Sequence, residues 1–456
     1  MIVTTARQRI GGLLRFFSDD SGASLAQLRE RRIALSAAMA MVAKAVAVLA
    51  GIISVPLTLD YLGTERFGLW MMLSSLIVFL NFADLGIGNG LVTLISAAHG
   101  RDDTAAVRAH VSSAFCVLTA MAALILGVFA ALYAALPWDQ LFNLTSDLAR
   151  AEAGPSVAAL ILCTACAIPA GIVQRAQMAL QLGYWASSWQ CAANLLALAM
   201  LVLAIWAKAS LPILVLAFVG TPVLVGVINA ALFFGVLRPA YRPSFGAVSR
   251  AVMGSVVGKG VLFLLLQVFV AVTFMSDNFF IAHKIGAEAV AGYAVPEKLF
   301  GLIGMLIALS LAPLWPAYGE ALARGDRDWT RRTLRRSTLW AGGIAALACG
   351  AMVLAAPMIL SIWTAGAVTA ALPLLLALAA VKVVDSVARA VSMYLCGANV
   401  ILLQVVLNAL AMVAAVVLKL WLIDVFGLSG AAWATAISYG GMLIALLAVI
   451  RWRRLV

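Results

Sequence analysis

Runs of about 20 apolar residues recur along the whole chain, and they constrain its fold more than any other feature. A helix that crosses a bilayer needs about 20 apolar residues. The sequence predicts twelve such helices, at 33–57, 69–97, 111–136, 155–178, 188–207, 211–236, 256–282, 292–317, 338–362, 370–396, 400–422 and 428–450. Since the chain is 64% hydrophobic and only 11% charged, it is expected to be an all-α polytopic membrane protein without a soluble domain.

The positive charges are distributed unevenly between the two sides of these predicted helices. Most of the 31 Lys and Arg residues fall on the side that holds the N-terminus. The cytoplasmic side of a membrane protein carries this excess, so both termini are expected to be cytoplasmic. The same rule explains the net charge of +12, which therefore gives no reason to expect nucleic acid as a partner.

The two halves of the chain resemble each other. Four polar or glycine residues recur at an offset of 214: Arg175, Gly183, Gln190 and Asn194 match Arg389, Gly397, Gln404 and Asn408. Short echoes also pair residues 62–65 with 285–288 and residues 100–103 with 325–328. Chance similarity among apolar helices is the alternative. A true repeat predicts two pseudo-symmetric six-helix bundles of equal orientation around a central cavity, a plan typical of transporters.

This repeat sets the expected domain organisation. We expect a cytoplasmic N-terminal tail at 1–32 and an N-terminal six-helix bundle at 33–240. A cytoplasmic connector at 241–255 leads to a C-terminal six-helix bundle at 256–450, and residues 451–456 form a cytoplasmic C-terminus.

One predicted span contains a polar, glycine-rich insert. The segment Phe82–Gly90 reads FADLGIGNG and lies between two apolar flanks. A carboxylate at that depth costs several kcal/mol unless it faces a bundle interior or water. The glycines at that depth permit close approach of another backbone or a local break in the helix. We therefore expect this span to face a polar interior.

The segment Val55–Trp70 (VPLTLDYLGTERFGLW), followed by FADLGIGNG, resembles the first two helices of the polysaccharide transporter family. These are Wzx-type flippases of the multidrug/oligosaccharidyl-lipid/polysaccharide exporter superfamily. The resemblance implies a V-shaped two-lobed bundle in the bacterial inner membrane. Its implied function is to flip undecaprenyl-diphosphate-linked oligosaccharide by alternating access, for O-antigen, exopolysaccharide or capsule synthesis. Polysaccharide polymerase machinery is then an expected partner, and a proton or sodium gradient a candidate energy source.

Two other functions compete with this one. The first is cation-coupled export of small organic molecules, which the same superfamily performs. The second is a membrane polysaccharide polymerase or ligase. The sequence offers no nucleophile–base set, no phosphate-cradling loop and no metal-ligand cluster, so we expect no catalytic residue, no cofactor and no enzymatic activity.

Lys44 and Asp84 are expected at similar depths in the first two spans. Counted from the cytoplasmic end at 1.5 Å per residue, both fall roughly 17–20 Å into the membrane. An ion pair between them would lower the cost of both charges. Such a pair could act as a gate or coupling element, or it could only fix the packing of the helices.

The tenth span carries Lys382, Asp385 and Arg389 on one helical face. The set has a net charge of +1, so one cation is expected to remain free, and Asp385 is a further gate or coupling candidate. Together with Arg175 in the other half, Lys382 and Arg389 are the predicted binding residues for an anionic headgroup. Snorkelling of Arg175 and Arg389 to the membrane surface is the alternative.

Amide side chains within the spans are candidates for contacts with sugar hydroxyls. They are Asn89, Asn194, Gln267 and Asn408. Such amides also bridge helices. By contrast, Asp277 lies near the outer end of its span and is expected to be a simple interfacial terminus.

Overall fold

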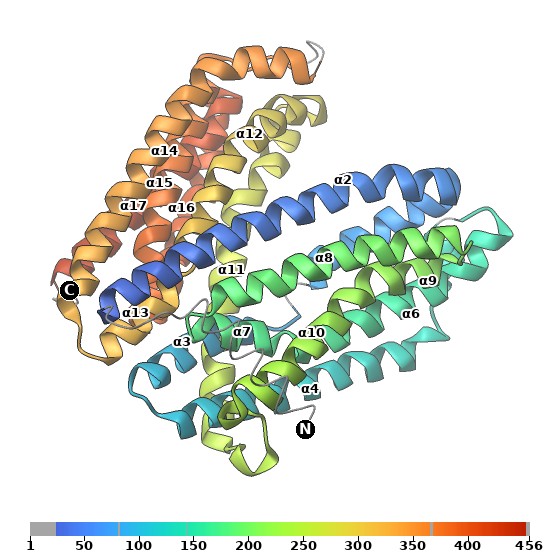
Figure 1. Ribbon diagram of the computed structural model, residues 1–456. Helices are drawn as coiled ribbons and strands as arrows, with labels where there is room; N and C mark the ends of the chain where they lie inside the picture. Colours follow the sequence, from blue (N-terminus) through green and yellow to red (C-terminus); the bar gives the residue numbers. More distant parts are fainter. Residues whose placement is uncertain (1–23, 81–82, 143, 365–367, 453–456) are drawn as a thin grey trace. The chain divides into compact units, whose positions relative to one another are not determined.

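The computed structural model describes residues 24–80, 83–142, 144–364 and 368–452, and these residues are almost entirely helical (Figure 1). The chain divides into two compact units, Met1–Gly260 and Val261–Val456. Each unit is described on its own below. No strand occurs in these described ranges.

The first unit is built on a long N-terminal helical segment. Its elements are α2 (Leu25–Leu80), α3 (Ile87–Gly100), α4 (Thr104–Tyr133), α5 (Trp138–Leu141), α6 (Asp147–Ala170), α7 (Ile172–Ala179), α8 (Gly183–Trp206), α9 (Leu211–Val215), η1 (Leu216–Gly220), α10 (Thr221–Leu232), η2 (Phe233–Leu237), η3 (Pro239–Tyr241) and η4 (Phe245–Ala247). Helices α2 and α8 run side by side, as do α4 and α6 (Figure 1). Leu69, Leu160 and Leu201 are buried together in one core, to which α2, α6 and α8 each contribute.

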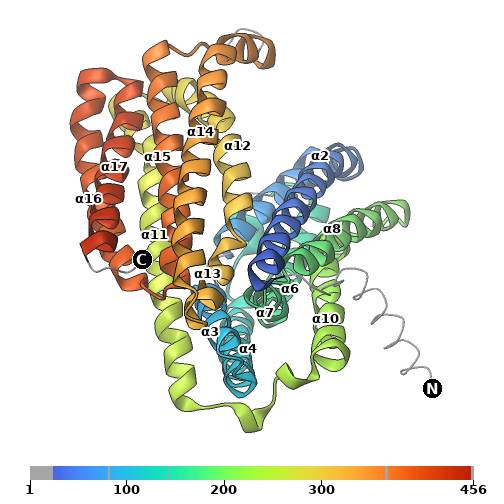
Figure 2. The same ribbon diagram turned by 60° about the vertical axis from the view of Figure 1, so that its left-hand side comes forward.

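The second unit is a bundle of long helices. Its elements are α11 (Arg250–Lys284), α12 (Ala287–Leu311), α13 (Leu314–Ala323), α14 (Arg327–Trp363), α15 (Leu372–Gly397), α16 (Ile401–Phe426) and α17 (Leu428–Trp452). Helix α15 packs against α12, α14 and α17 (Figure 2). It is therefore the central helix of this unit, and the charged residues that it carries lie among other helices.

Helix α11 begins in the first unit. A Cβ atom at Gly260 would lie 2.7 Å from Ile87 Cγ1 and 3.0 Å from Ile87 Cα. The backbones of α11 and α3 therefore approach so closely that only glycine fits at this contact. This packing holds the first turns of α11 with the first unit, so the second unit begins at Val261, five residues beyond the expected start of the second bundle.

The described helices account for the twelve predicted spans. Ten stretches are long and apolar enough to cross a membrane. The first of them contains two helices, because the backbone at Gly63 is non-helical (φ 71°, ψ 174°). Helix α15 is not among the ten, and it holds the three charged residues Lys382, Asp385 and Arg389. The ten stretches, together with α15 and the second part of α2, make twelve spans. The twelve-span, all-α fold is therefore confirmed.

Some boundaries differ from the expected ones. Helix α2 begins at Leu25, eight residues before the expected start of the first span. The rest of the predicted tail, residues 1–23, lies outside the described residues, as do residues 453–456. The second span was expected to be continuous over 69–97, but α2 ends at Leu80 and α3 begins only at Ile87.

The repeat is visible in the backbone, with one change of register. Gly63 and Gly286 both have positive φ (71° and 123°) where two spans are joined, as the first echo predicts. In the second echo the residues with left-handed backbone angles are Asp102 and Gly325. They are separated by the same number of positions as Gly63 and Gly286. The next residue in each half, Asp103 or Asp326, caps the following helix. The sequence alignment of 100–103 with 325–328 was therefore wrong by two residues.

A similar shift separates Arg175 from Arg389. The loops after α7 and α15 each contain a left-handed residue, Gln181 (φ 58°) and Asn399 (φ 60°). Arg175 lies six residues before the first of these, whereas Arg389 lies ten residues before the second. The two arginines are therefore one helical turn apart in the repeat, and the prediction that they are equivalent was wrong.

Candidate functional site

The break in the second span is organised around Asp84. Its Oδ1 accepts a hydrogen bond from the Gly86 N–H (2.9 Å), and its Oδ2 accepts one from the Gly88 N–H (3.3 Å). The chain reaches these positions because Leu85 (φ 49°) and Gly86 (φ 72°) adopt left-handed conformations. A carboxylate that accepts free amide hydrogens at a helix start is stabilised by those bonds and by the helix dipole.

Arg175 of α7 reaches the same place. Its Nη1 donates to Asn89 Oδ1 over 3.0 Å. A Cβ atom at Gly88 would lie 2.8 Å from both Arg175 Nε and Asp84 Oδ2, so the guanidinium and the carboxylate both lie against this glycine. Asp84, Gly88, Asn89 and Arg175 thus form one site, which we call the α3 break site.

The predicted pair between Lys44 and Asp84 does not form. The side chain of Lys44 is exposed, and the hydrogen bonds of Asp84 go to Gly86 and Gly88. The prediction failed because it placed Asp84 on a continuous helix, where no backbone N–H is free. The break supplies such donors locally, so Asp84 needs no lysine partner.

In the second unit, both predicted cations have a carboxylate partner. Lys382 Nζ lies 2.8 Å from Glu297 Oε1, and Arg389 Nε lies 2.9 Å from Asp385 Oδ2. The prediction that the tenth span leaves one cation free was therefore wrong, because it ignored Glu297 on α12. Glu297 and Arg389 are 37% and 40% exposed at their side chains, against 10% for Lys382 and 7% for Asp385. Each pair therefore has one member that a ligand can reach.

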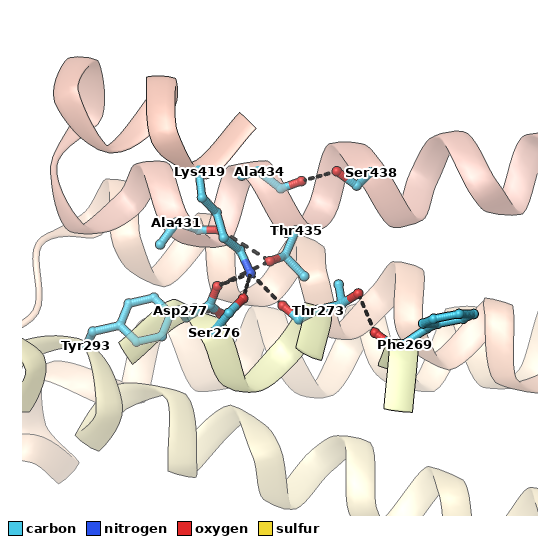
Figure 3. A network of polar contacts seen from close by, with 10 residues as sticks. All are labelled: Phe269, Thr273, Ser276, Asp277, Tyr293, Lys419, Ala431, Ala434, Thr435 and Ser438. Carbon is cyan, nitrogen blue, oxygen red and sulfur yellow. Dashed lines mark hydrogen bonds and ion pairs between the residues drawn. The ribbon is translucent and has the colours of Figure 1, made fainter. Parts of the chain in front are cut away.

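A further ion pair in this unit is buried on both sides (Figure 3). Lys419 Nζ on α16 lies 2.7 Å from Asp277 Oδ1 on α11, and the two side chains are 0% and 6% exposed. The prediction that Asp277 is an interfacial terminus was wrong. Two opposite charges within apolar spans were the sequence signal for this pair.

Further hydrogen bonds complete this buried network. Tyr293 Oη donates to Asp277 Oδ2 over 2.5 Å, and Thr435 Oγ1 donates to Oδ1 over 3.4 Å. Lys419 Nζ also donates to the Thr273 carbonyl and to Ser276 Oγ. Four helices, α11, α12, α16 and α17, are joined through these groups (Figure 3). Because a buried charge is tolerated only when it is paired and hydrogen-bonded, this arrangement fixes the packing of the bundle.

An aromatic contact links Lys382 of the tenth span to Tyr439 on α17. The ring centroid of Phe274, on the same helix as Asp277, lies 5.9 Å from Lys382 Nζ and 4.9 Å from the ring of Tyr439. The Tyr439 hydroxyl donates to Asn408 Oδ1 over 3.3 Å. Polar groups and aromatic rings thus form a connected path within the second unit.

The predicted amides occupy different environments. Asn89 binds Arg175, and Asn408 bonds to Tyr439 and to the Gln404 carbonyl. Gln267 donates to the Phe263 carbonyl of its own helix. The Nδ2 atom of Asn194 is buried without a partner. The Asn408 contact bridges two helices, which is the structural reading of such amides.

No group of three or more His, Cys, Asp or Glu side chains in the described ranges is arranged to hold a metal ion. All six cysteines are free, and Cys163 and Cys166 form no disulfide.

Comparison with known proteins identifies the family. Residues 34–322 match the family model described as "Polysaccharide biosynthesis protein", and residues 263–421 match the MatE model. No curated protein matches the sequence at a significant level.

Several solved structures share the fold. One is an outward-facing multidrug resistance MATE family transporter of the MOP superfamily, with 14% identity, a TM-score of 0.77, and coverage of 94% of this chain and 98% of that one. Another, with the same figures, is a MOP superfamily transporter from Pyrococcus furiosus whose description reports a binding pocket of reversed polarity. A MATE transporter from Vibrio cholerae has 12% identity, a TM-score of 0.78, and coverage of 93% and 98%.

The helical fold and these matches define a multi-pass membrane transporter of the MOP superfamily, the multidrug/oligosaccharidyl-lipid/polysaccharide exporters. Within that superfamily the chain belongs to the polysaccharide transporter family, because the polysaccharide model covers more than half of its length.

Proposed function

We propose that this transporter flips undecaprenyl-diphosphate-linked oligosaccharide from the cytoplasmic to the periplasmic leaflet of the bacterial inner membrane, by alternating access. The product would serve the synthesis of a surface polysaccharide such as O-antigen, exopolysaccharide or capsule. Polysaccharide polymerase machinery is the proposed partner. The family match supports a polysaccharide-related cargo, and the charged groups of both units support an anionic one.

Arg175 is the observation that carries this proposal. Its hydrogen bond goes to the neutral amide of Asn89, and the described residues include no ion pair of Arg175. Within a span, such a guanidinium keeps its charge and several N–H donors for a ligand. A diphosphate offers anionic oxygens that an arginine can bind through two N–H groups at once.

Lys382 and Arg389 are the proposed contacts in the second unit. In this structure their charges are balanced by Glu297 and Asp385, so a diphosphate would have to replace a carboxylate on each. Glu297 is over a third exposed, which lets its carboxylate move to water when a ligand takes Lys382. Asp84 and Asp385 are proposed as gate or coupling residues. Protonation and deprotonation of these two carboxylates, or sodium binding beside them, would couple transport to a proton or sodium gradient.

Asn89, Asn194 and Asn408 are the proposed sugar contacts, with Gln267 as a further candidate. Asn194 has a buried Nδ2 without a protein partner, so a sugar hydroxyl would satisfy a donor that is otherwise unpaired.

Cation-coupled export of small organic molecules is the second candidate function. One specific observation favours it: the carboxylates Glu297 and Asp385 neutralise the cations of the tenth span. A lumen of balanced charge suits a cationic molecule better than a lumen with free arginines. One of the solved structures with the same fold is a multidrug resistance MATE family transporter.

The proposed cytoplasmic position of both termini leads to a test with reporter fusions. Fusions after Ala135 and Lys208 should report the outside of the membrane, and fusions after Gly100, Arg242 and Arg327 should report the cytoplasm, because basic residues remain inside. An inside signal after Lys208 would contradict the orientation and the even number of spans in the first half.

The role of the tenth span can be tested by glycan export from cells that depend on this chain. Replacement of Lys382 and Arg389 together by Ala should lower export at normal protein levels, because two of the proposed anion contacts are lost. The control is Arg335→Ala on α14, an exposed arginine that should not change export. Normal export by the double variant would remove the second unit from the anion site.

A further inference from the structure

The segment that joins the last span of the first half to α11 is rigidly held. The expected connector was 241–255, but in the structure the segment runs from the residue after η2 to the first residue of α11, so we define the connector as residues 238–250. Three hydrogen bonds fix it to the start of α4: Ser112 Oγ accepts the Ser244 N–H (3.1 Å), Ser113 Oγ accepts the Ser249 N–H (3.3 Å), and Arg108 Nε donates to the Arg242 carbonyl (3.2 Å). Tyr241 is also buried, at 8% exposure. The connector therefore has a defined conformation.

This fixed segment presents one aromatic ring to its surroundings. Phe245 opens the 3-10 turn η4 and is 92% exposed, the highest value among the large apolar side chains of the described residues. A phenylalanine that can reach no protein core gains free energy only by burial in another apolar phase.

The connector that carries this ring also carries several positive charges. Arg238, Arg242 and Arg250 of the connector are all exposed. The sequence contains no Asp or Glu between Glu152 and Asp277, so no neighbour along the chain balances these arginines. None of the three forms an ion pair with another described residue, so their counter-charge can come from a source outside the protein.

The place of the connector in the chain indicates that source. It begins directly after the span that ends at Leu237, and it ends where the span Arg250–Lys284 begins. A short link between two membrane spans lies at the level of the lipid headgroups. Anionic lipids attract basic segments at this level, and aromatic rings insert at the boundary with the acyl chains.

We propose that the connector is a binding site for anionic phospholipid. The arginines Arg238, Arg242 and Arg250 bind headgroup phosphates, and Phe245 inserts between the acyl chains beside them. This site is separate from the transport site and does not depend on the identity of the cargo.

Native mass spectrometry of the purified full-length chain tests the charge requirement, with phosphatidylglycerol and phosphatidylcholine as the probes. The triple variant Arg238→Gln, Arg242→Gln, Arg250→Gln should bind phosphatidylglycerol about fivefold more weakly for each charge removed. Binding of phosphatidylcholine should change little. The matched control is Arg331→Gln, Arg332→Gln, Arg335→Gln, which removes the same charge from exposed positions on α14.

The comparison of these two variants decides the charge requirement. Retained phosphatidylglycerol in the control and loss in the connector variant would support the site. Equal losses in both variants would overturn it, because the effect would then be one of total charge. Unchanged binding in the connector variant would overturn it as well.

A photo-crosslinking experiment tests Phe245 without removing any charge. Benzoylphenylalanine at position 245 keeps an aromatic ring there and reacts with neighbouring C–H bonds on irradiation. In equimolar phosphatidylglycerol and phosphatidylcholine vesicles, the chain should form lipid adducts, with phosphatidylglycerol in excess. Adducts to protein alone, or none, would overturn the proposal, as would adducts that contain both lipids equally.

Discussion

Replacement of Lys419 by Met should remove most of the folded protein from the membrane. The side chain of Lys419 is completely buried and lies 2.7 Å from Asp277. Its loss leaves an uncompensated carboxylate inside the second unit, and breaking such a pair costs about 3–5 kcal/mol. Asp277→Asn should have a similar effect, since it leaves the ammonium unpaired. The measurement is the yield of monodisperse protein after mild solubilisation, together with its melting temperature.

The double variant separates charge from packing. Lys419→Met with Asp277→Asn removes both charges, and Tyr293 and Thr435 still offer hydroxyls to the new amide, so yield and melting temperature should recover in large part. The matched control is Asp147→Asn, whose exposed side chain pairs with Arg150 at 3.9 Å and should matter little. Strictly additive losses in the double variant would show that the two side chains do not stabilise each other.

Replacement of Arg175 by Ala should give the largest loss of transport among variants that still fold. In the proposed function this guanidinium binds the diphosphate. A hydrogen bond to a charged group contributes about 1.5–3 kcal/mol, which corresponds to roughly a 10- to 100-fold loss of transport rate at low cargo concentration. Arg175→Lys should recover only part of the rate, because lysine cannot bind through two N–H groups.

A second variant tests the same site without removing a charge. Gly88→Ala places a methyl group 2.8 Å from Arg175 Nε and Asp84 Oδ2, so the arginine must move and transport should fall. The control is Gly68→Ala on α2, where an added Cβ meets nothing within 4 Å. Normal transport by both Arg175→Ala and Gly88→Ala would show that the α3 break site does not contact the cargo.

The sequence predicted the number and positions of the spans because hydrophobic length is a strong local signal. It allowed a local break at the glycine-rich insert before α3 but did not predict the geometry of that break. Asp84, Gly86 and Gly88 were visible as a polar insert, but the hydrogen bonds from glycine amides to Asp84 depend on left-handed backbone angles that no hydropathy pattern encodes. The wrong pairing of Lys44 with Asp84 followed directly from treating that insert as regular helix.

The charged pairs show a second limit of sequence reasoning. Lys382, Asp385 and Arg389 were found because they share one helical face. Glu297 was missed because its contact with Lys382 joins residues 85 positions apart. The Asp277–Lys419 pair was missed for the same reason, since side-chain partners on different helices depend on the packing of the bundle. The equivalence of Arg175 and Arg389 was wrong by one turn because apolar helices align almost equally well in neighbouring registers.

The most direct test of the proposed function is transport by the purified chain in proteoliposomes. The vesicles would contain undecaprenyl-diphosphate-linked oligosaccharide, and a membrane-impermeant periodate would report how much of the sugar reaches the outer leaflet. Ethidium movement in the same vesicles, under a proton or sodium gradient, would report export of a small cation. The proposed function predicts that the whole pool of glycolipid becomes accessible, that Arg175→Ala slows this process, and that ethidium does not move. The result that would contradict it is movement of ethidium while the glycolipid stays accessible only to the extent seen in vesicles without the protein.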